Sequence, residues 1–130
     1  MYKFFYILLF LSTNVFASDY GITGVIDTPS ARMQNDGTLK ITFSHQDIAN
    51  ITNITYQATP WLETTFRYAY GSSYNYKDRS FAAKITLLKE SELKPNIAIG
   101  IQDILGTGVF SSEYIVASKK IKNIDISLGL

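Results

Sequence analysis

Apolar and polar side chains alternate one by one along several stretches of this chain. Between positions 62 and 70, for example, Leu62, Phe66 and Tyr68 alternate with Glu63 and Arg67. A period of two residues places each set on one face of a β-strand. An all-β chain with this pattern either packs its apolar faces together in a sandwich or turns them to lipid in a transmembrane barrel. The alternation therefore narrows the fold to two architectures.

The same pattern predicts seven strands and no helix. The predicted strands span 38–45, 50–58, 61–70, 80–88, 96–102, 113–119 and 124–130. If the first strand begins on the periplasmic side, the outer connections are 46–49, 71–79 and 103–112. The outer connections are longer on average than the inner ones, which are 59–60, 89–95 and 120–123. Outer-membrane barrels have the same difference in loop length. We expect the apolar rows to share one face of an antiparallel meander; they are Leu39-Ile41-Phe43, Phe66-Tyr68, Ile97-Ile99-Ile101 and Ile124-Ile126-Leu128.

The first seventeen residues have the features of a cleavable secretory signal. Lys3 precedes an apolar stretch over 4–11, and Val15 and Ala17 supply small residues before the expected cleavage site. The stretch is shorter than the ~20 residues that a membrane-spanning helix needs. The chain contains no cysteine, so neither a disulfide framework nor a lipoprotein-type anchor is expected. We predict a signal peptide at 1–17, a lead-in at 18–37 and part of a β-barrel at 38–130.

The charge balance is close to neutral. The chain has 12 Lys and Arg against 11 Asp and Glu, and removal of the signal takes away Lys3 alone. This balance argues against nucleic-acid binding and against attraction to anionic membrane surfaces. Nine Tyr, eight Phe and one Trp suit a boundary between water and an apolar phase, including the aromatic girdles of membrane barrels.

Charged residues on the polar faces are the first candidates for function. Lys40, Glu63, Arg67, Lys84 and Asp125 lie opposite the apolar rows, which in a barrel is the lumen. Glu63 and Arg67 stand about 13 Å apart along one strand, so each needs a partner on another strand. A wet lumen suits contact with a sugar polymer, and Trp61 offers a ring for stacking. The alternative is that these charges pair with one another and bind nothing.

A second cluster falls in the predicted outer loop 71–79 and consists of Lys77, Asp78 and Arg79, preceded by Tyr74 and Tyr76. It is either an ordinary polar loop tip or a carbohydrate contact. The full set of candidate polymer contacts is Glu63, Arg67, Lys84, Trp61, Tyr76, Lys77 and Arg79.

Cofactor and metal chemistry find little support. His45 is the only histidine, so no metal centre is predicted. Gly106-Thr107-Gly108 lacks the Lys-Ser/Thr of a phosphate loop and suits a tight turn instead, as does Asp27-Thr28-Pro29. A glycosidase would need two carboxylates, for which Asp103 and Glu113 are the candidates.

Four spaced segments carry a family resemblance. They are 23–33 (Thr-Gly-Val-Ile-Asp-Thr-Pro-Ser-Ala-Arg-Met), 60–68 around Pro60-Trp61-Leu62-Glu63, 76–81 around Tyr76-Lys77-Asp78-Arg79, and 100–120. Together they resemble the N-terminal part of the YjbH/WbfB-type family of outer-membrane exopolysaccharide proteins. The resemblance implies a β-barrel in the bacterial outer membrane that assists secretion of exopolysaccharide or capsule. Its expected partners are outer-membrane lipid, exopolysaccharide and other exopolysaccharide-operon envelope proteins. From the residues and the charge balance we expect no catalysis, no cofactor and no nucleic acid.

Two other functions stay open at this point. One is a soluble secreted β-sandwich that binds carbohydrate, and the other is a carbohydrate-active enzyme. Seven is an odd number of strands, whereas single-chain bacterial barrels close with an even number of at least eight. We therefore expect this chain, whose last residue Leu130 falls inside a strand, to be part of a longer barrel.

Overall fold

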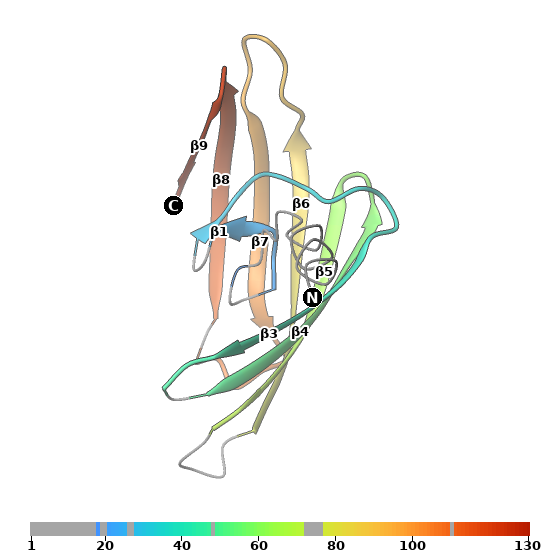
Figure 1. Cartoon of the computed structure of the whole chain (residues 1–130), viewed down its shortest axis with the longest axis vertical. Helices are drawn as coiled ribbons and strands as arrows, with labels where there is room; N and C mark the ends of the chain where they lie inside the picture. The colour runs from blue at the N-terminus through green and yellow to red at the C-terminus, as the bar shows by residue number, and fades with distance from the viewer. Residues whose placement is uncertain (1–17, 19–20, 26–27, 48, 72–76, 110) are drawn as a thin grey trace, which may run out of the picture.

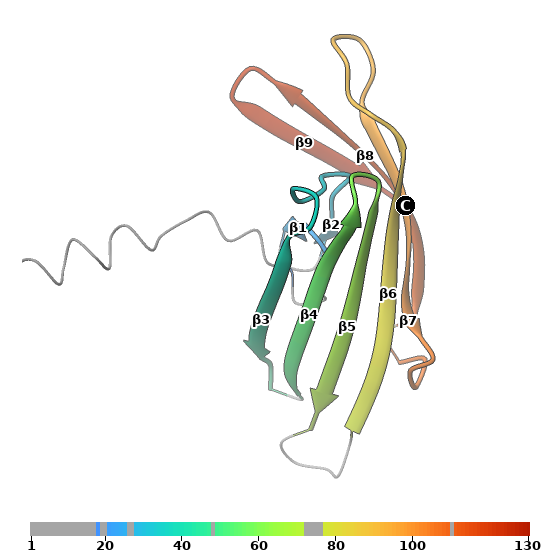
Figure 2. The same cartoon turned by 90° about the vertical axis from the view of Figure 1, so that its right-hand side faces the viewer.

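A computed structural model shows one antiparallel sheet of seven strands joined in sequence order. It describes residues 18, 21–25, 28–47, 49–71, 77–109 and 111–130. The strands are β3 (Leu39–His45), β4 (Asn50–Thr59), β5 (Leu62–Tyr70), β6 (Lys77–Leu88), β7 (Asn96–Ile104), β8 (Ser112–Ile121) and β9 (Ile124–Gly129). The sheet curls along its length into a half-barrel (Figures 1 and 2). The seven predicted strands are confirmed. The described ranges contain no helix that could span a membrane.

The predicted facing of the apolar rows is also confirmed. Directly paired residues of an antiparallel sheet lie on the same face. One continuous row pairs Ile41 with Ile54, Ile54 with Phe66 and Phe66 with Phe81. A second row pairs Ile85 with Ile99 and Ile99 with Ile115, and a third joins Ala117 to Leu128. All of these residues lie on the convex side of the sheet.

The two faces have the opposite polarity to those of a water-soluble sheet. On the convex face Phe43 is 78% exposed and Leu128 75%. The buried side chains of the concave face are mostly polar; they include Asn53, Thr55, Gln57, Glu63, Thr65, Arg67, Ser80, Lys84 and Ser118. In the part of the chain that the structure describes, no second sheet covers the apolar face. The arrangement is that of a barrel wall and not of a β-sandwich.

The described residues of the lead-in, 18, 21–25 and 28–37, lie on the concave side of the half-barrel (Figures 1 and 2). Gly24–Val25 (β1) and Thr28–Pro29 (β2) pair antiparallel as a minimal two-stranded sheet, and both strands lie within the curl of the larger sheet (Figures 1 and 2). Of the turn predicted at Asp27-Thr28-Pro29, Asp27 lies outside the described residues, and Thr28 and Pro29 form β2. The docking of this segment was not predicted from the sequence.

Candidate functional site

The centre of the concave face holds a buried ion pair. Glu63 of β5 and Lys84 of β6 are directly opposite each other in the strand register. The distance from Lys84 Nζ to Glu63 Oε1 is 3.2 Å, and the two residues are 0% and 1% exposed. The prediction that Glu63 lies on the face opposite the apolar rows and has a cross-strand partner is therefore confirmed. Such a pair, removed from water, needs further polar partners to be stable.

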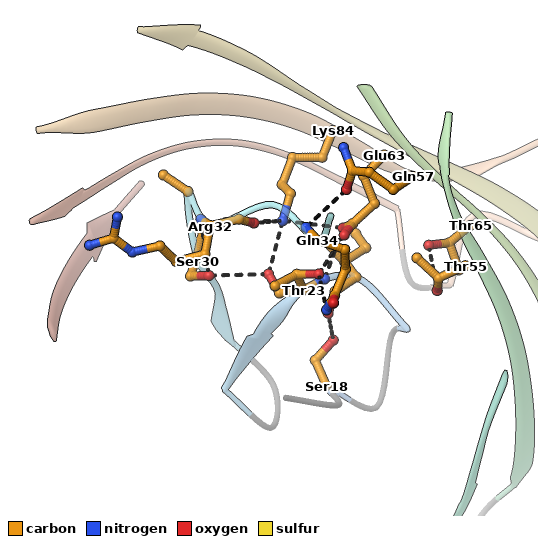
Figure 3. Close-up of polar contacts among 12 residues, drawn as sticks. Ser18, Thr23, Ser30, Arg32, Gln34, Thr55, Gln57, Glu63, Thr65 and Lys84 are labelled. Carbon is orange, nitrogen blue, oxygen red and sulfur yellow. Dashed lines mark hydrogen bonds and ion pairs between the residues drawn. The ribbon is translucent and has the colours of Figure 1, made fainter. Parts of the chain in front are cut away.

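The lead-in backbone supplies those partners (Figure 3). Lys84 Nζ donates hydrogen bonds to the carbonyl oxygens of Thr23 (3.0 Å), Ser30 (3.2 Å) and Arg32 (2.8 Å). The Thr23 amide donates to Glu63 Oε1 at 2.9 Å, and the Thr23 hydroxyl donates to Glu63 Oε2. The ion pair thus holds both ends of the β1–β2 segment against the sheet.

Close backbone approach reinforces the docking at Gly21. The Thr55 hydroxyl donates to the Gly21 carbonyl oxygen at 2.7 Å. A Cβ at position 21 would lie 2.6 Å from Asn53 Cβ and 2.8 Å from Thr65 Cγ2, and the backbone φ is +79°. Only glycine fits this position without movement of the wall.

Further along, Ala31 and Gln34 dock on opposite parts of the sheet. The Ala31 amide donates to Ser118 Oγ at 2.9 Å, and Asn96 Nδ2 donates to the Ala31 carbonyl oxygen at 2.5 Å. The Gln34 amide donates to Gln57 Oε1 at 3.0 Å. The lead-in therefore crosses the concave face from β4 to β8 and returns to begin β3.

Arg32 ties the lead-in to the β6–β7 turn and to the beginning of β9 at one end of the half-barrel. Its Nε and Nη2 donate to both oxygens of Asp125, at 2.9 and 2.7 Å, and its Nη1 donates to Glu90 at 2.5 Å. The Asp125 contact raises the pKa of Arg32 further, against the opposing effect of burial. The Arg32 hydrogen bond, with a second from the Lys120 amide, lowers the pKa of Glu90 to about 2. Asp125, predicted on the lumen side, lies near the beginning of β9 and its side chain is exposed.

A second buried cluster lies toward the other end. Arg67 Nη2 is 3.4 Å from Asp103 Oδ1 and 3.9 Å from Asp78 Oδ2. The Thr107 amide donates to Asp78 Oδ1 at 3.1 Å, so the loop after β7 folds over Arg67. A Cβ at Gly106 would lie 1.8 Å from Asp103 Oδ1, which agrees with a tight turn in Gly106-Thr107-Gly108.

The remaining candidates are distributed over different surfaces. Trp61 is 49% exposed in the turn between β4 and β5, and Tyr76 lies outside the described residues. The assignment of Lys77 and Arg79 to an outer loop is wrong. They belong to the beginning of β6, where they pair with Tyr70 and Tyr68, because the hydrogen-bonded ladder between β5 and β6 continues to Lys77. Both side chains are exposed. Lys40 is half-buried on the concave face.

The structure does not bring the possible glycosidase pair together. Asp103 points to Arg67 on the concave side. Glu113 pairs with Ile101, a residue of the convex row, and is exposed. Among the described residues no group of His, Cys, Asp and Glu could hold a metal ion, and His45 Nδ1 instead shares a 2.6 Å hydrogen bond with Asn50 Oδ1.

These features define a class of protein, a β-barrel wall with a polar lumen side on which the protein's own N-terminal segment is docked. The family model described as "Exopolysaccharide biosynthesis protein YbjH" matches residues 16–130, so the chain belongs to this family, as the resemblance implied. The chain is 39% identical over 125 residues to "Uncharacterized lipoprotein YjbH" of Escherichia coli (strain K12), an alignment that covers 87% of this chain and 18% of that relative. The chain thus spans about a fifth of the relative's length. No solved structure matches it.

The lead-in contacts were missed because they join residues far apart in the sequence. Thr23 and Glu63 are 40 positions apart, and Arg32 and Asp125 are 93. One signal was present: two opposite charges at facing positions of adjacent strands, in a lumen, require polar groups from some other segment.

Proposed function

We propose that this chain forms part of the wall of an outer-membrane β-barrel that assists secretion of exopolysaccharide without catalysing a reaction. The observation that carries the proposal is the polarity of the sheet, with a continuous apolar convex face and a buried polar concave face. Hydrocarbon accommodates such a convex face, because the strands satisfy one another's backbone groups and the convex side chains in the middle of the strands are mainly apolar. The convex charges Lys77, Arg79 and Glu113 lie near strand ends.

Membership of an exopolysaccharide biosynthesis family supports a role in the production and secretion of that polymer. The Escherichia coli relative is described as a lipoprotein, which supports export of this chain to the cell envelope. The separation of Asp103 and Glu113 onto opposite faces supports a role other than glycoside hydrolysis.

Polymer contact belongs to the same proposal, but the candidate residues differ in access. Trp61, Lys77 and Arg79 are exposed. Glu63, Arg67 and Lys84 are buried under the lead-in and the loop after β7. Contact of these three with a polymer requires the covering segments to leave.

The proposal is tested by deleting the gene and measuring exopolysaccharide in two pools, at the surface and inside the envelope. We expect less surface polymer and an undiminished envelope pool, because a barrel would let the polymer cross the outer membrane and would not take part in its synthesis. The complemented strain serves as the control. Polymer of altered chain length in the deletion strain would contradict the non-catalytic role.

Membrane fractionation tests the location separately. The full-length protein should stay in the outer-membrane fraction after a high-salt wash and be released by detergent. Recovery in the soluble periplasm would overturn the assignment of the convex face to lipid.

A further inference from the structure

A cavity with several polar side chains in its wall lies between the lead-in and the β8–β9 hairpin, at the end of the half-barrel where Arg32 is anchored. Its volume is about 610 Å³, which is within the roughly 300–1,000 Å³ typical of small-ligand pockets. Thr23, Gly24, Ser30 and Met33 contribute to the wall on the lead-in side. The side chains that give the cavity its polar character are Arg32, Gln34, Asn35, Lys120, Asp125 and Ser127.

Several of these polar groups are already arranged by the fold. Arg32 and Asp125 hold each other in a two-bond contact, and Gln34 Nε2 donates to Thr23 Oγ1 at 3.1 Å. The Ser127 hydroxyl is fixed at 2.7 Å from Ser118 Oγ. Planar amide, guanidinium and carboxylate groups held in place can each bond two neighbouring hydroxyls, the arrangement that a pyranose ring presents.

Two polar groups of the cavity remain available for a ligand. Within the described residues, the Asn35 amide has no hydrogen-bond partner and Lys120 Nζ has no ion-pair partner. Both side chains are exposed. A free cation beside a free amide matches a sugar that carries a negative charge.

The charge of the surrounding surface has the same sign. The end of the hairpin carries Lys119, Lys120 and Lys122. The neighbouring carboxylates are those of Asp125, paired with Arg32, of Glu90, paired with Arg32 and Lys119, and of Glu92 in the β6–β7 turn. The four cations, Arg32 included, outnumber the three carboxylates, and such an excess of positive charge favours an anionic chain.

We infer that this cavity is a binding subsite for an acidic sugar unit of a polysaccharide. The inference rests on the proposed function, since it names the class of polymer that the barrel would handle. It assigns Lys120 to the acidic group and Asn35, Gln34 and Ser127 to hydroxyls.

The test measures binding of two fluorescent probes to the full-length protein in detergent: an oligogalacturonate, and a neutral malto-oligosaccharide of equal length. We expect the oligogalacturonate to bind at least about tenfold more tightly, and Lys120→Gln to weaken its binding by about tenfold. Asn35→Ala should weaken both probes. Lys122→Gln is the matched control, because it removes the same charge from the same hairpin at a position outside the cavity, and it should leave binding within about twofold.

Equal affinity for the two probes, or equal losses in Lys120→Gln and Lys122→Gln, would overturn the subsite. Its failure is distinguishable from failure of the proposed function. If gene deletion lowers surface polymer while neither probe binds, the secretion role stands and the subsite falls. If the oligogalacturonate binds as expected while deletion leaves surface polymer unchanged, the subsite stands and the secretion role falls.

Discussion

Glu63 and Lys84 carry opposite charges at facing positions and are both buried, so their stability depends on every remaining donor and acceptor finding a partner. Those partners are Thr23, Ser30 and Arg32 of the lead-in. The charge pair and the docked segment therefore stabilise each other. Removal of either should release the other.

Replacing Lys84 by Met in the full-length protein should lower the free energy of unfolding by about 3–5 kcal/mol. The change leaves the Glu63 carboxylate buried without its counter-ion and three lead-in carbonyls without their donor. Lys77→Met, on the exposed beginning of the same strand, should change stability by at most about 0.5 kcal/mol. Urea denaturation in detergent measures both, and similar losses in the two variants would contradict the role of the pair.

Two glycines with nearly the same backbone conformation separate the effect of close packing from that of strain. Gly21 has φ +79° and no room for a Cβ, whereas Gly37 has φ +75° and open space. Both alanine variants carry the strain of a left-handed residue, about 1 kcal/mol. Only Gly21→Ala should loosen the lead-in, detected as faster trypsin cleavage after Arg32. Equal cleavage rates in the two variants would show that the close approach is not required.

At the scale of the elements, the strands were predictable and what covers them was not. Alternation is a local property, so rows such as Ile97-Ile99-Ile101 identify a strand and its apolar face. The pattern does not say what lies against the polar face. β6 begins three residues earlier than predicted because Lys77, Asp78 and Arg79 read as loop residues by type, and pairing with β5 makes them strand. Cross-strand context decided the boundary there.

The contact between the lead-in and the β6–β7 turn should depend on pH. The pKa of Glu90 is lowered to about 2 in the folded chain, so its stabilising contribution is complete above its ordinary pKa of 4.5 and is lost as the pH falls toward 2. The difference in urea midpoint between the wild type and Glu90→Gln should therefore be largest above pH 4.5 and vanish near pH 2. A difference that stays constant over this range would contradict the assignment.

The facing of the strands predicts unequal costs for introduced charges. Ile99 lies in the middle of β7 on the convex face, and Ile99→Lys should cost about 2–4 kcal/mol if that face meets lipid at the midplane. Thr42→Lys, at the middle of β3 on the concave face, should cost much less. Unfolding of the full-length protein in lipid vesicles measures the two costs, and equal values would count against the barrel.

For the molecule as a whole, the sheet is curled but open. In the described residues β3 pairs only with β4 and β9 only with β8, so each presents an edge of unpaired backbone groups. The docked lead-in covers the concave face and leaves both edges as they are. Hydrocarbon cannot satisfy such edges, and in water they favour aggregation.

Residues 18–130 expressed alone should therefore fail to insert into outer-membrane lipid as a heat-modifiable monomer. Unheated gel electrophoresis after refolding in lipid vesicles measures this, with a known eight-stranded barrel as the positive control. A compact, protease-resistant species of the isolated segment would mean that seven strands can close.

The lead-in also has a consequence for how this protein can change over evolutionary time. On the convex face any apolar side chain serves, so positions such as Ile99 and Phe43 are free to drift among Leu, Ile, Val and Phe. On the concave face the charges of Glu63 and Lys84 meet polar groups of the distant lead-in, and Gly21 packs against the wall without room for a Cβ, so these three residues can change only together with the residues they meet. Among relatives, we expect substitutions to be frequent and independent on the convex face of the sheet, and rare and paired on the concave face.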